Sequence, residues 1–139
     1  MSESFMMPKI LVIDDNRLLS CVVCSILERE GHSVVLARDG LEGLAKFRAE
    51  LPDLVITDML MPGLGGAGTI VEMRQEAPDT QIIAIAGGGM INGMHPLIVA
   101  RKLGVVETLS KPFTIDDLVN SVTRVIGSLS IAHQDQALA

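Results

Sequence analysis

The chain has 139 residues, the length of one compact domain, and its hydrophobic content of 48% is sufficient for a buried core. Its 11 Lys and Arg residues against 17 Asp and Glu residues give a formal charge of −6, which argues against a nucleic-acid partner held by a basic surface. No apolar run approaches the roughly 20 residues that span a bilayer, and residues 1–8 lack the features of a signal peptide, so we expect a cytoplasmic protein without a membrane partner.

Short apolar runs alternate along the chain with segments whose apolar residues recur at helical spacing. In the first half of the chain, the pattern predicts strands over Lys9–Asp14, Val34–Ala37 and Asp53–Asp58, separated by helices over Leu19–Leu27 and Leu41–Phe47. In the second half, it predicts helices over Thr69–Ala77, Leu97–Leu103 and Ile115–Ile126, separated by strands over Gln81–Ala86 and Val105–Leu109. Continuous apolar runs are typical of strands that are buried on both faces of a parallel sheet.

Several residues mark the ends of the predicted helices. Gly31 and Gly104 follow the first and fourth helices as stop signals, and Pro78 closes the third. Thr114 precedes the last helix, and Asp117 stands close to the spacing of a capping box. These signals support the helical assignments.

Strands that alternate with helices predict an α/β domain, with a doubly wound parallel sheet and helices on both faces. We expect this domain over residues 8–127, an N-terminal extension over 1–7, and a C-terminal tail over 128–139 that begins with a last helical turn and then frays.

Charged side chains stand where the predicted strands end. Asp14 and Asp15 close the first strand, Asp58 closes the third, and Lys111 follows the fifth. In an open α/β sheet, ligands bind outside the carboxyl ends of the strands. If the first and third strands are neighbours, three carboxylates converge, and their repulsion calls for a hard cation such as Mg²⁺ or Mn²⁺. Taken alone, Asp14 and Asp15 suggest a solvated strand end or a helix N-cap more readily than a metal site.

Three segments at these strand ends carry a family resemblance. They are Ile10–Asn16, Val55–Gly63 and Ser110–Phe113, and together they resemble the signature segments of response regulator receiver domains. The resemblance extends over residues 8–127. It implies a flavodoxin-like (βα)5 fold whose five-stranded parallel sheet has the strand order 2-1-3-4-5.

The resemblance also implies a role for each residue. Asp58 matches the phosphoacceptor, and Asp15 and Asp58 match direct Mg²⁺ ligands, whereas Asp14 reaches the ion through water. The backbone carbonyl of Leu60 matches the remaining protein ligand. Lys111 matches the lysine that holds a phosphoryl oxygen, and the bond that follows it is usually cis in the family. The implied partners are a histidine kinase or histidine phosphotransfer protein and a downstream protein target, and we expect a monomer or weak dimer.

Two positions depart from the family pattern. Ala86 stands where a Ser or Thr normally ends the fourth strand, and Thr108 stands where the family carries an aromatic switch residue. The phosphoacceptor chemistry is expected to survive, whereas the usual conformational readout lacks both of its side chains. The Gly-rich segment 87–93 is expected to be a flexible loop. A receiver-fold interaction module that is independent of phosphorylation is therefore the alternative.

An enzyme is the less favoured reading of the same residues. Haloacid-dehalogenase-like phosphatases also use a strand-end Asp and Mg²⁺, but they place a second Asp two residues after the nucleophile. Leu60 occupies that position after Asp58, and Asn16 occupies it after Asp14. A DNA-binding regulator is disfavoured because the chain is acidic. We therefore expect a protein that is not an enzyme.

Two further sequence features have simple interpretations. Cys21 and Cys24 have the CxxC spacing, but they fall inside the first helix, past the turn where a helix dipole would activate a thiol. The methionines flanking the proposed site are expected to offer an adaptable contact surface: Met59, Met61, Met90 and Met94.

Overall fold

The computed structural model describes the backbone of residues 7–138 and the side chains of residues 7–129. The strands are β1 (Lys9–Ile13), β2 (Ser33–Ala37), β3 (Leu54–Asp58), β4 (Gln81–Ala86) and β5 (Glu107–Ser110). The helices are α1 (Arg17–Arg29), α2 (Gly40–Glu50), α3 (Gly66–Glu76), α4 (Pro96–Lys102) and α5 (Ile115–Leu138).

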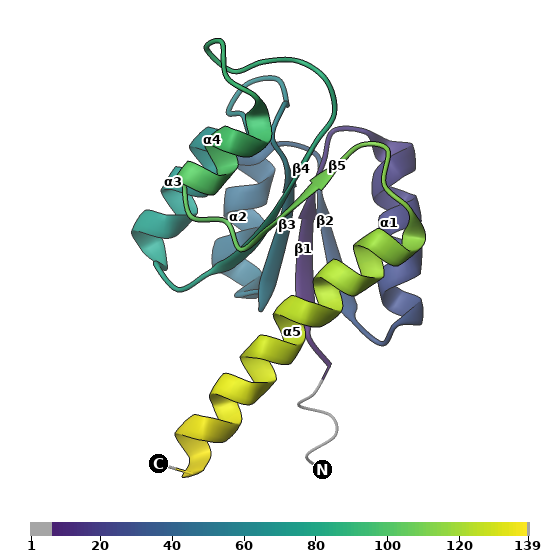
Figure 1. Ribbon diagram of the computed structural model, residues 1–139, viewed down its shortest axis with the longest axis vertical. Coiled ribbons are helices and arrows are strands. Elements are labelled where there is room, and N and C mark those ends of the chain that lie inside the picture. The colour runs from purple at the N-terminus through teal and green to yellow at the C-terminus, as the bar shows by residue number, and fades with distance from the viewer. Residues whose placement is uncertain (1–6, 139) are drawn as a thin grey trace.

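All five strands are parallel and lie in the order β2-β1-β3-β4-β5. Helices α1 and α5 cover one face of the sheet, and α2, α3 and α4 cover the other (Figure 1). The flavodoxin-like (βα)5 fold and the predicted strand order are therefore confirmed. The order places the end of β1 directly beside the end of β3.

The central strands are buried on both faces because their side chains alternate between two cores. In β1, Ile10 and Val12 pack with residues of α1 and α5, whereas Leu11 and Ile13 pack with residues of α2, α3 and α4. This arrangement explains the continuous apolar runs in the sequence. The acidic residues Asp14 and Asp58 stand at the carboxyl ends of β1 and β3.

Several predicted boundaries differ from the structure by two or three residues, and two of the differences have clear physical causes. The last strand begins at Glu107 rather than Val105, because the Val105 amide bonds the Ala100 carbonyl (3.3 Å) and so belongs to the turn that ends α4. Helix α3 begins at Gly66 rather than Thr69, and its N-cap residue Gly65 offers no side-chain cap. Glycines have low helix propensity, which hid this first turn.

Helix α5 continues to Leu138, whereas only a last turn and a frayed end were expected after Gly127. A single glycine inside a helix costs only about 1 kcal/mol relative to Ala, which is too little to end it. The capping box at its start is present: the Asp117 amide bonds Thr114 Oγ1 (2.9 Å), and the Thr114 amide bonds Asp117 Oδ2 (3.0 Å). Among the described residues, no helix is both long and apolar enough to cross a membrane.

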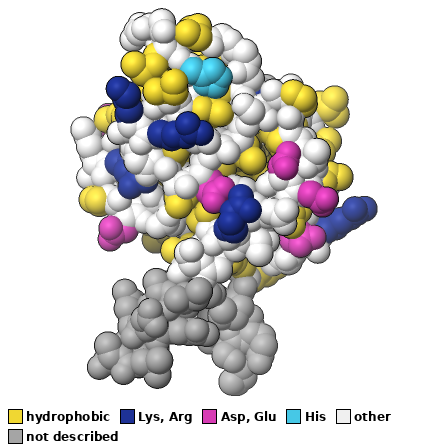
Figure 2. All heavy atoms as spheres, in the orientation of Figure 1, with side chains coloured by type: hydrophobic (Ala, Val, Ile, Leu, Met, Phe, Trp, Pro, Cys, Tyr) yellow, Lys and Arg dark blue, Asp and Glu magenta, His cyan; other side chains and the backbone are white. Residues whose placement is uncertain are grey.

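The segment between β4 and α4, expected to be a flexible loop, contains a β-hairpin. The backbones of Ile91 and Met94 exchange two hydrogen bonds (2.8 and 2.9 Å), and the residues between them, Asn92 and Gly93, both have positive φ. This is the pattern of a type I′ turn, for which Asn-Gly is the preferred sequence. We call residues 87–95 the β4–α4 hairpin, and hydrophobic side chains gather over it at the top of the view in Figure 2.

Candidate functional site

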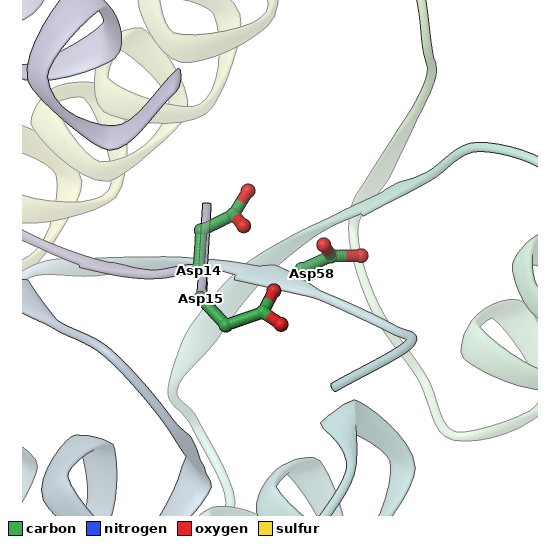
Figure 3. A group of neighbouring side chains, drawn as sticks. All are labelled: Asp14, Asp15 and Asp58. Carbon is green, nitrogen blue, oxygen red and sulfur yellow. The ribbon is translucent and has the colours of Figure 1, made fainter. Parts of the chain in front are cut away.

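Three carboxylates meet at the carboxyl ends of β1 and β3. One oxygen from each of Asp14, Asp15 and Asp58 lies within 4.8 Å of the others. Figure 3 shows the three side chains directed to the same side of the strand ends. Asp14 and Asp58 are each only 5% exposed, whereas Asp15 is exposed to solvent. The structure thus brings together the acidic residues that the sequence predicted.

Backbone amides fix the orientation of the two buried carboxylates. Asp14 Oδ1 accepts a hydrogen bond from the Asn16 amide (2.9 Å), and Asp58 Oδ1 accepts one from the Leu60 amide (3.2 Å). The N-cap of α1 is Asn16, whose Oδ1 accepts from the Leu19 amide. The N-cap interpretation of Asp14 and Asp15 is therefore wrong, and both carboxylates remain available at the site.

Lys111 adds a positive charge to the cluster. Its Nζ lies 3.0 Å from Asp58 Oδ2 and 3.6 Å from Asp14 Oδ2. The Lys111–Pro112 bond is cis, as the resemblance implied. Partial burial by itself lowers the pKa of the Lys111 ammonium, but the hydrogen bond to Asp58 and the charge of Asp14 outweigh it, so the pKa is raised. Lys111 therefore stays positively charged at neutral pH.

One ammonium does not neutralise three carboxylates. Burial raises the pKa of the Asp14 carboxyl above its ordinary value; the Asn16 amide opposes this rise, and the charge of Asp58 adds to it. The cluster therefore retains unfavourable negative charge, which a cation would relieve. The donors are all oxygen atoms, which fits a hard divalent cation such as Mg²⁺. Asp14, Asp15, Asp58 and the Leu60 carbonyl are the groups that would hold it.

Close packing of α3 against β3 sets the backbone behind Asp58. A methyl group on Gly66 would collide with the Asp58 carbonyl and would lie 2.6 Å from Met59 Cα. Gly66 therefore permits the first turn of α3 to lie directly on the end of β3. No local sequence pattern signals this role, because it depends on packing between α3 and the end of β3.

The two departures from the family pattern stand at the expected places. Ala86 is the last residue of β4 and is fully buried, and its carbonyl accepts from the Lys111 amide (2.8 Å). On β5, Thr108 Oγ1 accepts a hydrogen bond from Arg101 of α4 (3.1 Å). Position 86 therefore has no side-chain hydroxyl, and position 108 has no aromatic ring.

The predicted methionine surface is only partly correct. Met59 is 1% exposed and belongs to the core, so it offers no contact surface, whereas Met90 is 60% exposed on the β4–α4 hairpin.

Cys21 and Cys24 are free thiols on α1. Burial raises the pKa of the Cys24 thiol, and nearby Glu28 adds to the rise, which is the opposite of what a reactive cysteine needs.

An apolar groove of about 300 Å³ lies beside Lys111, between α1 and the loop from β5 to α5. Leu19, Val22, Phe113 and Ile115 are among its lining residues. Leu18 of α1 also exposes its apolar side chain, as do Val22 and Ile115 at the groove itself. The site is therefore flanked by an apolar surface.

Comparisons with known proteins agree with this geometry. The profile of the response regulator receiver domain matches residues 10–123. A receiver domain protein from Clostridium thermocellum superposes with a TM-score of 0.82 at 34% identity, covering 91% of this chain and 99% of that one. The sporulation initiation phosphotransferase F of Bacillus subtilis is 27% identical over 118 residues, which are 85% of this chain and 93% of the relative.

Longer proteins also match. The nitrogen assimilation regulatory protein NtrX of Azorhizobium caulinodans is 32% identical over 131 residues, and the match covers 93% of this chain but 28% of that protein. The chain thus spans only between 28% and 54% of the length of the first relatives that it matches. With a family match over most of its length, this chain belongs to the response regulator receiver domain family.

Proposed function

We propose that this receiver domain accepts a phosphoryl group on Asp58 with the help of Mg²⁺. The observation that carries the proposal is the position of the Asp58 carboxylate. It is almost fully buried, lies at the end of β3, and faces two further carboxylates and the Lys111 ammonium. A nucleophile, a cation site and a fixed positive charge are the groups that phosphoryl transfer to a carboxylate requires.

The chemistry follows from these groups. An Asp58 carboxylate oxygen forms a bond to phosphorus, and the bond between phosphorus and the donor's imidazole nitrogen breaks. That nitrogen keeps the electron pair and takes up a proton. Lys111, held 3.0 Å from Asp58 Oδ2, is placed to pair with a phosphoryl oxygen. When bound, Mg²⁺ would supply neutralising charge for the carboxylates and the phosphoryl oxygens.

The proposed donor is a histidine kinase or a histidine phosphotransfer protein. The apolar groove beside Lys111 supports a protein donor, because it offers a surface for apolar side chains next to the acceptor. The proposed role is that of an acceptor and not of an enzyme acting on a free substrate. Leu60, an apolar residue, stands where a phosphatase of the haloacid-dehalogenase type would need its acid.

A phosphoryl-incorporation experiment tests the proposal. The protein is incubated with phosphoramidate or acetyl phosphate and Mg²⁺, and its intact mass is measured. We expect one phosphoryl increment, which is lost in the Asp58→Asn variant and without Mg²⁺. Asp53→Asn, at the amino end of β3, serves as the matched control and keeps the increment. An increment that persists in Asp58→Asn would contradict the proposal.

A second candidate function is a protein-interaction module that does not depend on phosphorylation. Ala86 and Thr108 favour it, because they remove the hydroxyl and the ring of the usual readout. A ligand shifts a conformational equilibrium only through contacts that differ between the two states. This candidate predicts equal affinity of a downstream protein for the phosphorylated and unphosphorylated protein, and a difference in affinity would eliminate it.

A further inference from the structure

Leu60 lies between the proposed phosphoacceptor and the β4–α4 hairpin. Its amide donates to Asp58 Oδ1 (3.2 Å), and its carbonyl is the proposed backbone ligand of the cation. Its side chain is 37% exposed and lies against Gly89, where an added methyl group would be 2.7 Å from Leu60 Cδ1. The backbone of this residue thus serves the site while its side chain contacts the hairpin.

The hairpin provides a defined surface for this contact. The paired backbones of Ile91 and Met94 close its turn, and Ile91 packs against the core formed with α2, α3 and α4. Ile91 also lines a groove of about 440 Å³ together with Leu60, Met61 and Pro62. The loop after β3 and the hairpin after β4 therefore pack against each other beside Asp58.

We propose that Leu60 is a positioning residue. The hairpin holds its side chain and so fixes the amide and carbonyl that serve Asp58 and the cation. The inference rests on the proposed function, because that site is what Leu60 positions. Coupling between two sites is reciprocal. If the contact between Leu60 and Gly89 favours cation binding, then cation binding stabilises this contact by the same free energy. Occupancy of the site can thus reach the hairpin without a hydroxyl at Ala86.

The glycines of the hairpin allow the contact to be tested separately from backbone strain. Gly89 has φ 99°, so Gly89→Ala introduces both strain and a collision with Leu60. Gly93 has φ 78° but open space around it, so Gly93→Ala introduces strain alone. Gly88 has neither feature among the contacts described, and Gly88→Ala controls for the added methyl group.

The experiment measures Mg²⁺ affinity by isothermal titration calorimetry for the whole chain, its three glycine variants, Leu60→Ala, and the double variants Leu60→Ala/Gly89→Ala and Leu60→Ala/Gly93→Ala. We expect Gly89→Ala and Leu60→Ala each to weaken Mg²⁺ binding about fivefold, the low end of measured site-to-site coupling. Gly88→Ala and Gly93→Ala should bind nearly as the wild type does. With Leu60 shortened, adding Gly89→Ala should weaken binding no further than adding Gly93→Ala.

A second readout follows the hairpin itself. On addition of Mg²⁺, the amide resonances of Asn92 and Gly93 should shift in the wild type, and the shift should be lost in Leu60→Ala. Leu60→Ala is expected to leave the fold intact, because the Leu60 side chain is partly exposed. Equal Mg²⁺ affinity in Gly89→Ala and Gly93→Ala would overturn the positioning role of Leu60. A wild type that binds no Mg²⁺ would instead overturn the proposed function.

Discussion

Asp14 shows the electrostatic cost of the site at the scale of a single residue. It is almost fully buried and shares its surroundings with Asp58, and burial raises its pKa. A carboxyl whose pKa is raised by folding favours the folded state only while it is protonated. Its contribution is therefore fully present below its ordinary pKa of 3.8 and is lost as the pH rises through the raised value.

Replacing Asp14 should therefore stabilise the protein when no divalent cation is present. In Mg²⁺-free buffer at pH 7, we expect Asp14→Asn to raise the free energy of unfolding, because it removes a buried negative charge beside Asp58. The gain should shrink toward zero below pH 4, where the wild-type carboxyl is protonated. Urea unfolding at several pH values measures this, with the exposed Asp79→Asn as a control that gains little. A loss of stability at pH 7 would contradict the electrostatic account of the site.

The charged residues of the site could be predicted because each stands at a strand end. Strand ends are visible in the sequence as the limits of apolar runs, as at Asp14 and Asp58. Side-chain packing between segments that are distant in the chain has no comparable signal in the sequence. The burial of Met59 and the contact of Leu60 with Gly89 depend on how the loops after β3 and β4 pack, which no local pattern encodes.

At the scale of elements, local signals predicted most helices and strands, and the exceptions have local causes. The capping box at Thr114 and Asp117 marked the start of α5 correctly. The Asn92-Gly93 pair signals a hairpin, but the surrounding glycines concealed it. The start of α3 was missed because Gly66 is used for close packing rather than for helix propensity.

The capping box should contribute measurably to the stability of α5. We expect Thr114→Ala to lower the free energy of unfolding by about 1 kcal/mol, because it leaves the Asp117 amide without its hydroxyl acceptor. Thr123→Ala, an exposed position in the middle of the same helix, is the control and should cost nothing. Thermal unfolding of both variants decides whether the cap is used.

Two helical glycines should respond in opposite directions to the same substitution. Gly127→Ala meets open space inside α5 and should stabilise the protein by about 0.5–1 kcal/mol through helix propensity. Gly66→Ala collides with the backbone of Asp58 and Met59 and should destabilise it by more than that amount. Chemical denaturation of the two variants measures both signs. Stabilisation by Gly66→Ala would show that α3 does not need its close approach to β3.

At the scale of the whole molecule, the fold serves to bring distant residues to one edge of the sheet. The order β2-β1-β3-β4-β5 sets the end of β1 beside the end of β3, and Lys111 reaches them from the loop after β5. The strand order came from the family resemblance, since apolar runs alone do not reveal which strands are neighbours. The convergence of the carboxylates depended on that order.

A cation that binds the folded cluster should stabilise the entire domain. At a Mg²⁺ concentration 100 times the dissociation constant, mass action adds about 2.7 kcal/mol to the free energy of unfolding. We expect the melting temperature to rise with Mg²⁺ in the wild type and much less in Asp58→Asn. The control Asp79→Asn, away from the described site, should keep the full rise. The same rise in Asp58→Asn would place the cation elsewhere.

The central claim is that Asp58 is the phosphoacceptor, and localising the phosphoryl group tests it most directly. The protein is phosphorylated with phosphoramidate and Mg²⁺, its acyl phosphate is reduced with borohydride, and the peptides are sequenced by mass spectrometry. The account predicts homoserine at position 58 and aspartate at positions 14 and 15. Reduction at another position, or unmodified Asp58 in a protein that binds Mg²⁺, would contradict it.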